Sequence, residues 1–153
     1  LTPVPNATVS AAGSVPTNDV TDANGDYTLS GLGTGAYTVT PSRAPQPIAT
    51  LNGISPTDSA LIAQFGAGFI TLNSNQLIAA DVTNNGTVSP LDAAYIAQWS
   101  IGIPNPGITG SWRFLPASRN YANAETNQVN QDYSAILMGD VTGNWNPLGP
   151  GFA

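Results

Sequence analysis

The sequence predicts a mainly β protein with an α-helical insert, and three observations lead to this fold class. Short segments rich in β-branched and aromatic residues, separated by turns rich in glycine, occur up to residue 45 and return after residue 107. Two short helical patterns lie between them, and these two patterns repeat each other. We therefore expect three parts: a discontinuous β-sandwich (residues 1–45 and 107–139), a two-helix insert (residues 46–106, completed by 140–146) and a tail (residues 147–153).

Several strands are expected in the sandwich. Those of its first part are Ala7–Ser10, Tyr27–Leu29 and Ala36–Thr40. Asn24-Gly25 precedes the second of them and is a strong hairpin signal, because both residues tolerate a positive φ. After the insert, Trp112 and Phe114 alternate with a polar residue, and Tyr133–Met138 is a continuous apolar run typical of a buried strand.

The insert is expected to contain two short helices, Pro56–Phe65 and Pro90–Ile101. Each pattern begins with proline, whose missing N–H is no loss at the first helical position, and has an aspartate in the first turn. The segments Ile54–Phe65 and Val88–Trp99 align without a gap at an offset of 34 residues, and both contain Ser-Pro-x-Asp and Ile-Ala-Gln. This alignment indicates an internal duplication, so we expect the helices to pack on each other about a local pseudo-twofold axis.

Residues 81–92 match the pattern of a calcium loop of the EF-hand type. Such a loop takes oxygen ligands from positions 1, 3, 5, 7, 9 and 12, with glycine at position 6 for a sharp turn. Gly86 is at position 6. The expected ligands are Asp81, Thr83, Asn85, the carbonyl of Thr87, Ser89 (directly or through a water) and Asp92. The alternative is an Asx-turn and a helix cap that hold no ion.

The first helix is preceded by only the back half of such a loop. Residues 53–58 supply positions 7, 9 and 12, whereas the preceding segment has no side-chain oxygen at the front positions. Near the end of the chain, residues 140–144 repeat the front half of the other loop, so we expect a second calcium site that is split between the two segments. Its expected ligands are Asp140, Thr142, Asn144, the carbonyl of Gly53, Ser55 and Asp58. The alternative is that Asp140 ends a strand in a turn and the first loop holds no ion.

Composition limits the function. The chain has 153 residues, no Lys, His or Cys, and nine acids against three arginines, for a net charge of −6. Thiol nucleophiles, His-assisted triads, Schiff-base lysines and Cys/His zinc sites are therefore excluded, and we expect no enzyme. The charge excludes electrostatic binding of nucleic acid, and no apolar run approaches the roughly 18 residues of a membrane span. The opening Leu1-Thr2-Pro3 is typical of a processed mature protein, so we expect secretion to the cell surface.

Two families are similar to parts of this chain. The duplicated helix with its 81–92 loop resembles dockerin type I modules, which carry paired calcium loop–helix units of the EF-hand type. The segment Val20–Val39 resembles the carboxypeptidase-regulatory (transthyretin-like) or B-type collagen-adhesin (Cna-B-like) repeat. These resemblances imply an immunoglobulin- or transthyretin-like β-sandwich with a dockerin-like calcium insert, as in secreted bacterial surface proteins.

The sequence departs from both families. Dockerins contact cohesin through Ser-Thr at loop positions 10 and 11 and through basic helix residues, but here these positions are Pro90-Leu91 and Pro56-Thr57, and the insert has no basic residue. The sandwich family opens with a strand for which this chain has no residues before Pro3. A sandwich without its first strand has an open edge that a strand of another subunit can fill. The candidate donor segments are Leu1–Ser10 and Pro147–Ala153.

From these features we expect a calcium-stabilised extracellular structural protein. Strand addition from subunit to subunit, head to tail, would build a self-assembling fibre or surface coat from copies of the chain. The alternative is a dockerin-like adaptor or adhesion module that binds a cohesin-type or carbohydrate-linked partner on a cell-surface scaffold protein. Neither function involves nucleic acid or a membrane span.

Overall fold

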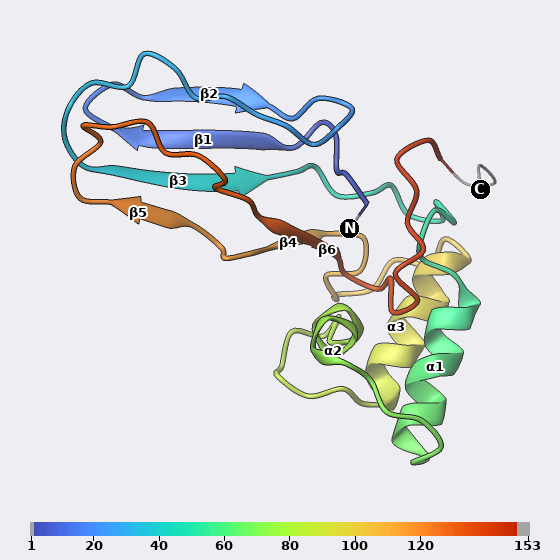
Figure 1. Ribbon diagram of the computed structural model, residues 1–153. Helices are drawn as coiled ribbons and strands as arrows, with labels where there is room; N and C mark the ends of the chain where they lie inside the picture. The colour runs from blue at the N-terminus through green and yellow to red at the C-terminus, as the bar shows by residue number, and fades with distance from the viewer. Residues whose placement is uncertain (1, 150–153) are drawn as a thin grey trace. The chain divides into compact units, whose positions relative to one another are not determined.

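The computed structural model describes residues 2–149, so the last part of the tail expected at 147–153 lies outside it. Over this range the chain has a mixed fold with two antiparallel sheets, six strands in all, and three helices (Figure 1). The elements are β1 (Thr8–Gly13), β2 (Thr17–Val20), β3 (Tyr37–Ser42), α1 (Pro56–Gly66), α2 (Ser74–Ala80), α3 (Pro90–Ser100), β4 (Trp112–Leu115), β5 (Arg119–Tyr121) and β6 (Ser134–Leu137). The expectation of strands interrupted by a helical insert is thereby confirmed.

The chain divides into two compact units. Unit 1 consists of Leu1–Ala44 and Arg113–Ala135, and unit 2 consists of Pro45–Trp112 and Ile136–Ala153. Residues 107–112 and 136–139, which sequence patterns group with the strands, lie in unit 2, because apolar residues of 136–138 belong to the core around the helices. The chain passes from one unit to the other after Ala44, within β4 and within β6.

The larger sheet belongs to unit 1 and has the strand order β2-β1-β3-β5, antiparallel throughout. β1 is an inner strand, in which Val9 is opposite Asp19 of β2 and Pro41 of β3. Buried and exposed residues alternate along β3, which places Tyr37 and Val39 on the core face with Val9. Figure 1 shows these four strands side by side.

One strand prediction is wrong. Tyr27–Leu29 lies in no strand, and Thr17–Val20 instead pairs with β1 as β2. Asn18 and Asp19 are poor strand formers, so intrinsic propensity gives no signal for β2, and its pairing with an inner strand decides the outcome. Tyr27 and Leu29 still pack against the core of the sheet.

The turn expected at Asn24-Gly25 is present, but it does not join two strands. The Asp22 carboxylate accepts the backbone N–H groups of Asn24 at 2.8 Å and of Asp26 at 3.0 Å, and Gly25 has a φ of +80°. This is an Asx-turn that closes the loop after β2.

Unit 2 contains the two predicted helices, and their starts agree with the sequence patterns. α1 and α3 both begin with proline after a serine N-cap, Ser55 and Ser89. They contact each other, and the Ser59 hydroxyl of α1 donates to the carbonyl of Ala93 in α3 at 2.9 Å. These two residues are 34 positions apart and so occupy equivalent places in the repeat.

The short helix α2 was not predicted. Asn73 is its N-cap and forms a reciprocal capping box with Gln76, in which each backbone N–H donates to the other side chain at 3.0 Å. Its C-cap is Asp81, so α2 leads directly into the 81–92 loop. The Asn-x-x-Gln spacing was the sequence signal for this helix. Of the helices within residues 2–149, none has the length and apolarity needed to cross a bilayer.

The core of unit 2 joins the helices to the segment that follows β6. Ile62 of α1 and Ile96 of α3, equivalent residues of the repeat, are both fully buried, and Met138 and Val141 pack with them. The N–H of Gly139 donates to the carbonyl of Ala79 in α2 at 2.7 Å. The returning chain is therefore fixed immediately before Asp140.

Candidate metal centre

All four acidic residues of unit 2 are buried. Their exposed fractions are 0% for Asp58, 8% for Asp81, 0% for Asp92 and 8% for Asp140. The five acids of unit 1, in contrast, are exposed or half-buried. Unit 2 contains no Lys, Arg or His, so none of its own side chains can neutralise these carboxylates.

The loop of residues 81–92 folds around Asp81. The Oδ1 atom of Asp81 accepts the N–H of Asn85 at 3.1 Å and the hydroxyl of Thr83 at 3.3 Å, and its Oδ2 atom accepts the N–H of Gly86 at 2.9 Å. Asn84 and Gly86 have positive φ values of 57° and 85°. These left-handed residues produce the sharp turn for which glycine at position 6 is favoured.

Asp92 closes the same loop from the first turn of α3. Its Oδ2 atom accepts the N–H of Ser89 at 2.8 Å and the Ser89 hydroxyl at 2.9 Å, and its Oδ1 atom accepts the N–H of Thr83 at 2.9 Å. Thr83 therefore links the two acids, because its backbone donates to Asp92 and its hydroxyl donates to Asp81. Thr87 joins the loop through Asn85, whose Oδ1 accepts both the N–H and the hydroxyl of Thr87.

Asp140 repeats the arrangement of Asp81 at the end of unit 2. Its Oδ1 atom accepts the hydroxyl of Thr142 at 3.1 Å and the N–H groups of Gly143 and Asn144 at 2.7 and 3.1 Å. Its Oδ2 atom accepts the N–H of Trp145 at 3.0 Å. The partners at loop positions 3, 5 and 6 are therefore the same as those around Asp81.

Asp58 completes this second arrangement from α1. Its Oδ2 atom accepts the N–H and the hydroxyl of Ser55 at 2.8 and 3.0 Å, as Asp92 accepts those of Ser89. Its Oδ1 atom accepts the N–H of Thr142 at 2.8 Å, although the two residues are 84 positions apart. The structure thus brings together the two half-loops that the sequence assigns to one split site.

Gly53 contacts the split site through its backbone. Its φ is +86°, and a Cβ atom there would lie 2.8 Å from the Cβ of Trp145 and 3.0 Å from Oδ2 of Asp140. Glycine is therefore required on two grounds, a left-handed backbone and a close approach to the carboxylate. This position was expected to supply a carbonyl ligand, and its backbone lies beside Asp140.

Three residues that support the split site were not predicted. The Asn52 side chain donates to the Asn146 carbonyl at 2.7 Å and accepts the Asn146 N–H at 3.0 Å. Trp145 packs edge-on against Trp112, with ring centroids 5.0 Å apart at 87°. The neighbouring Asn52-Gly53 and Trp145-Asn146 dipeptides show no motif in the sequence, because these contacts join segments far apart in the chain.

Charge repulsion is present within the split site. Burial raises the pKa of Asp140 above its ordinary value, and the negative charge of Asp58 raises it further. The N–H groups of Trp145 and Asn144 and the hydroxyl of Thr142 act in the opposite direction. A cation between the two carboxylates would remove the repulsion.

The donors in both loops fit a hard cation. They are carboxylate, hydroxyl, carboxamide and carbonyl oxygens, the ligands that calcium takes, and the chain has no Cys or His for a zinc site. Within residues 2–149, no group of three or more acidic, Cys or His side chains is placed to hold a metal. Each loop accordingly offers two carboxylates, and neutral oxygens would have to complete the coordination.

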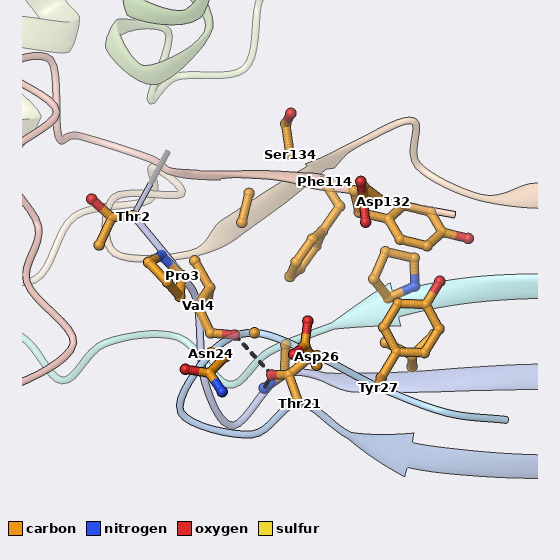
Figure 2. A pocket seen from close by; sticks show the side chains of 16 residues that line it. Thr2, Pro3, Val4, Thr21, Asn24, Asp26, Tyr27, Phe114, Asp132 and Ser134 are labelled. Atoms are coloured by element: carbon orange, nitrogen blue, oxygen red, sulfur yellow. Dashed lines mark hydrogen bonds between the residues drawn. The ribbon is translucent and has the colours of Figure 1, made fainter. Parts of the chain in front are cut away.

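A separate hollow of about 270 Å³ lies in unit 1 (Figure 2). Residues from the sheet (Val9, Pro41) and from β4 and β6 (Phe114, Ala135) line it, together with Tyr27. The other lining residues include the carboxylates of Asp26 and Asp132, so apolar and polar groups share the walls of the hollow.

The segment Thr2–Val4 borders this hollow and is anchored to its own chain. As Figure 2 shows, the Thr21 hydroxyl donates to the Val4 carbonyl, at 2.7 Å. The same hydroxyl accepts the N–H of Ala7 at 2.9 Å.

No protein-family model, curated protein or solved structure matches this chain. A proposal for its function therefore rests on the chemistry of the two loops.

Proposed function

We propose that unit 2 binds two calcium ions, one in the 81–92 loop and one in the split site, and that the chain is a calcium-stabilised extracellular structural protein rather than an enzyme. The observation that carries this proposal is the burial of all four carboxylates of a unit that has no basic residue. A buried charge without a counter-charge lowers stability by roughly several kcal/mol. Two divalent cations would balance four carboxylates.

The equivalence of the two loops supports two ions. In each loop a threonine hydroxyl and the backbone N–H groups of positions 5 and 6 fix the first aspartate, and a serine fixes the last one. A simple helix cap needs only the last aspartate and the serine. The buried first aspartate, linked through threonine to the last, is the additional feature that an ion explains.

Weak calcium binding is expected, and it favours an extracellular role. The charge of a calcium loop and its rigidity set the affinity, and extracellular modules bind with a Kd of about 10⁻⁴–10⁻³ M. Each loop here has only two carboxylates, with threonine at position 3 and asparagine at position 5. Such sites fill in a calcium-rich medium outside the cell.

The split site gives calcium a structural role. It joins residues 53–58 to residues 140–145 and so closes a long loop of chain that contains all three helices. An ion that binds only the folded chain stabilises it through mass action, and closing a long loop removes entropy from the unfolded chain. Calcium here would take the place that disulfides hold in cysteine-containing secreted proteins.

Assembly of copies by strand addition is the second part of the proposal, and the edges of the larger sheet support it. β2 and β5 are its outer strands, so each has one side that pairs with no other strand of the described residues. The hollow in unit 1 would bury an apolar side chain of a donated segment.

The candidate donor segments differ in their availability. Thr8–Gly13 forms an inner strand of its own sheet, so the candidate Leu1–Ser10 is already paired within the chain over residues 8–10. The candidate Pro147–Ala153 is described only through residue 149. Because residues 8–10 of the other candidate are already paired, we propose the C-terminal segment as the donor.

A calcium titration tests the first part of the proposal. Protein freed of metal is titrated with calcium in a calorimeter, and the bound ions are counted by native mass spectrometry. We expect two ions per chain, and we expect one ion in Asp92→Asn and one in Asp140→Asn. Asp132→Asn, which alters an exposed acid of unit 1, is the control and should still bind two. A chain that binds no calcium at millimolar concentration would overturn the proposal.

Electron microscopy of the purified protein in calcium tests the assembly. Regular polymers that disappear when the chain is truncated after residue 146 would support strand addition from the C-terminal segment. A monomer that captures a cohesin would instead identify the dockerin-like adaptor.

A further inference from the structure

The surface of unit 2 carries no charged side chain. Its four acidic residues are buried, and it has no Lys, Arg or His, so every exposed side chain of this unit is neutral. An ordinary globular domain has about 25% charged residues, nearly all at its surface. A surface without charges has little to prevent close association.

Large aliphatic residues are exposed where two segments of this surface meet. We call them the aliphatic patch, and they are Ile48, Leu51, Ile101 and Ile103, with exposed fractions of 42, 53, 69 and 47%. The two segments are joined by a hydrogen bond from the Ala49 N–H to the Trp99 carbonyl at 3.1 Å. A Cβ atom on Gly102 would lie 3.8 Å from the Cβ of Ala49, in ordinary contact.

The end of α3 holds the patch in place. Gly102 has a φ of +81° and donates its N–H to the Trp99 carbonyl at 3.1 Å, and Ile103 donates to the Gln98 carbonyl at 2.9 Å. This left-handed turn closes the helix and fixes the backbone on both sides of Gly102. Ile101 and Ile103 therefore lose little further backbone entropy when a partner covers them.

We propose that the aliphatic patch is the docking surface for a second copy of this chain, and that calcium binding permits the docking. The proposal rests on the two calcium sites proposed above. Without calcium, four carboxylates give unit 2 a charge of −4, and two copies repel each other. With two calcium ions bound, the side-chain charge of the unit is zero and each chain keeps only the −2 of unit 1 (−6 + 4), so the repulsion between copies is much weaker.

The absence of surface charge on unit 2 also favours a second copy of the chain as the partner that covers the aliphatic patch. A charged partner would lose hydration at the patch without gaining a counter-charge, since the unit offers none at its surface. A second copy offers the same aliphatic residues, so a symmetric contact places patch against patch. Four aliphatic side chains are fewer than the roughly 20–30 residues on each side of a standard interface, so the neutral surface around them must form the rim and the association is weak.

Sedimentation velocity over a range of protein concentrations tests the docking. We expect the chain truncated after residue 146, which has no donor segment for strand addition, to associate reversibly in calcium and to be monomeric after the calcium is chelated. Ile101→Lys should weaken the association about tenfold or more, because it puts an unpaired charge at the centre of the contact. The matched control is Phe69→Lys, which adds the same charge at another exposed apolar residue of unit 2 (exposed fraction 81%).

Calcium stoichiometry, measured on the same samples, separates the possible failures. Two bound ions together with a monomeric chain would overturn the docking proposal and leave the calcium sites intact, whereas a chain that binds no calcium would overturn the sites themselves. Equal weakening by Ile101→Lys and Phe69→Lys would show that charge anywhere on the unit opposes association and would overturn the assignment to the patch. Ile103→Lys provides a second test of the patch if Ile101→Lys fails to fold.

Discussion

The carboxylate of Asp58 accepts the backbone N–H of Thr142 at 2.8 Å, across 84 residues of sequence. In the other loop, Asp92 accepts the N–H of Thr83 at 2.9 Å, across nine residues. The two interactions are equivalent, so one loop geometry is built once from a continuous segment and once from two distant ones. The distant version fixes the chain after β6 to the first turn of α1.

Calcium should stabilise the fold through this connection. An ion present at a hundredfold excess over its Kd contributes about 2.7 kcal/mol per site when it binds only the folded chain. We expect the melting temperature followed by circular dichroism to rise steadily with calcium concentration and to fall by several degrees on chelation. Magnesium at the same concentration serves as the control for ionic strength, and an equal effect of both ions would contradict a selective calcium site.

Gly53→Ala should destabilise the calcium-loaded protein by about 1–3 kcal/mol, because it strains a left-handed residue and places a methyl group against Trp145 and Asp140. Gly68→Ala is a matched control, since Gly68 has a similar φ of +77° but nothing within 4 Å of an added Cβ. The difference between the two variants in urea denaturation isolates the contact with the split site. Equal losses would mean that the backbone alone accounts for the effect.

The pH dependence of stability should differ between the calcium-free and the calcium-loaded protein. Burial and the nearby Asp58 raise the pKa of Asp140 in the folded chain. A carboxyl whose pKa is higher in the folded than in the unfolded chain favours folding while it is protonated. Its contribution to the free energy of unfolding is complete below the unfolded pKa of about 3.9 and is lost as the pH rises through the folded pKa. Acidification from neutral pH should therefore make the Asp140 contribution more favourable in the calcium-free protein.

In the calcium-loaded protein, acidification should instead lower the stability, because protons compete with the ion for the same carboxylates. The melting temperatures of the two forms should converge as the pH falls, in scans made in metal-free buffer and in saturating calcium. Asp140→Asn should show less convergence than the wild type. A constant difference between the two forms across this pH range would count against an ionised Asp140 as a ligand.

Local signals predicted α1, α3 and both half-loops; α2 was missed although its Asn73-x-x-Gln76 spacing is also local, and contacts between distant residues explain the other omissions. Proline after serine marked the starts of α1 and α3, and these starts agree with the structure. β2 contains Asn18 and Asp19, and it is a strand because it pairs with β1, which no local pattern encodes. The Asn52–Asn146 contact joins residues 94 positions apart, so no pattern of adjacent residues predicts it.

Trp145 should report the occupancy of the split site. Its backbone N–H is bound to Asp140 and its ring packs on Trp112, so any movement of residues 140–146 changes the surroundings of both rings. We expect the tryptophan fluorescence to change as calcium is added, and we expect Asp58→Asn to remove most of that change while Asp92→Asn leaves most of it. Trp99 lies in α3 and is present in both variants, so its signal is a shared background. If Asp92→Asn removed the change and Asp58→Asn did not, Trp145 would not be reporting on a calcium ion held between Asp58 and Asp140.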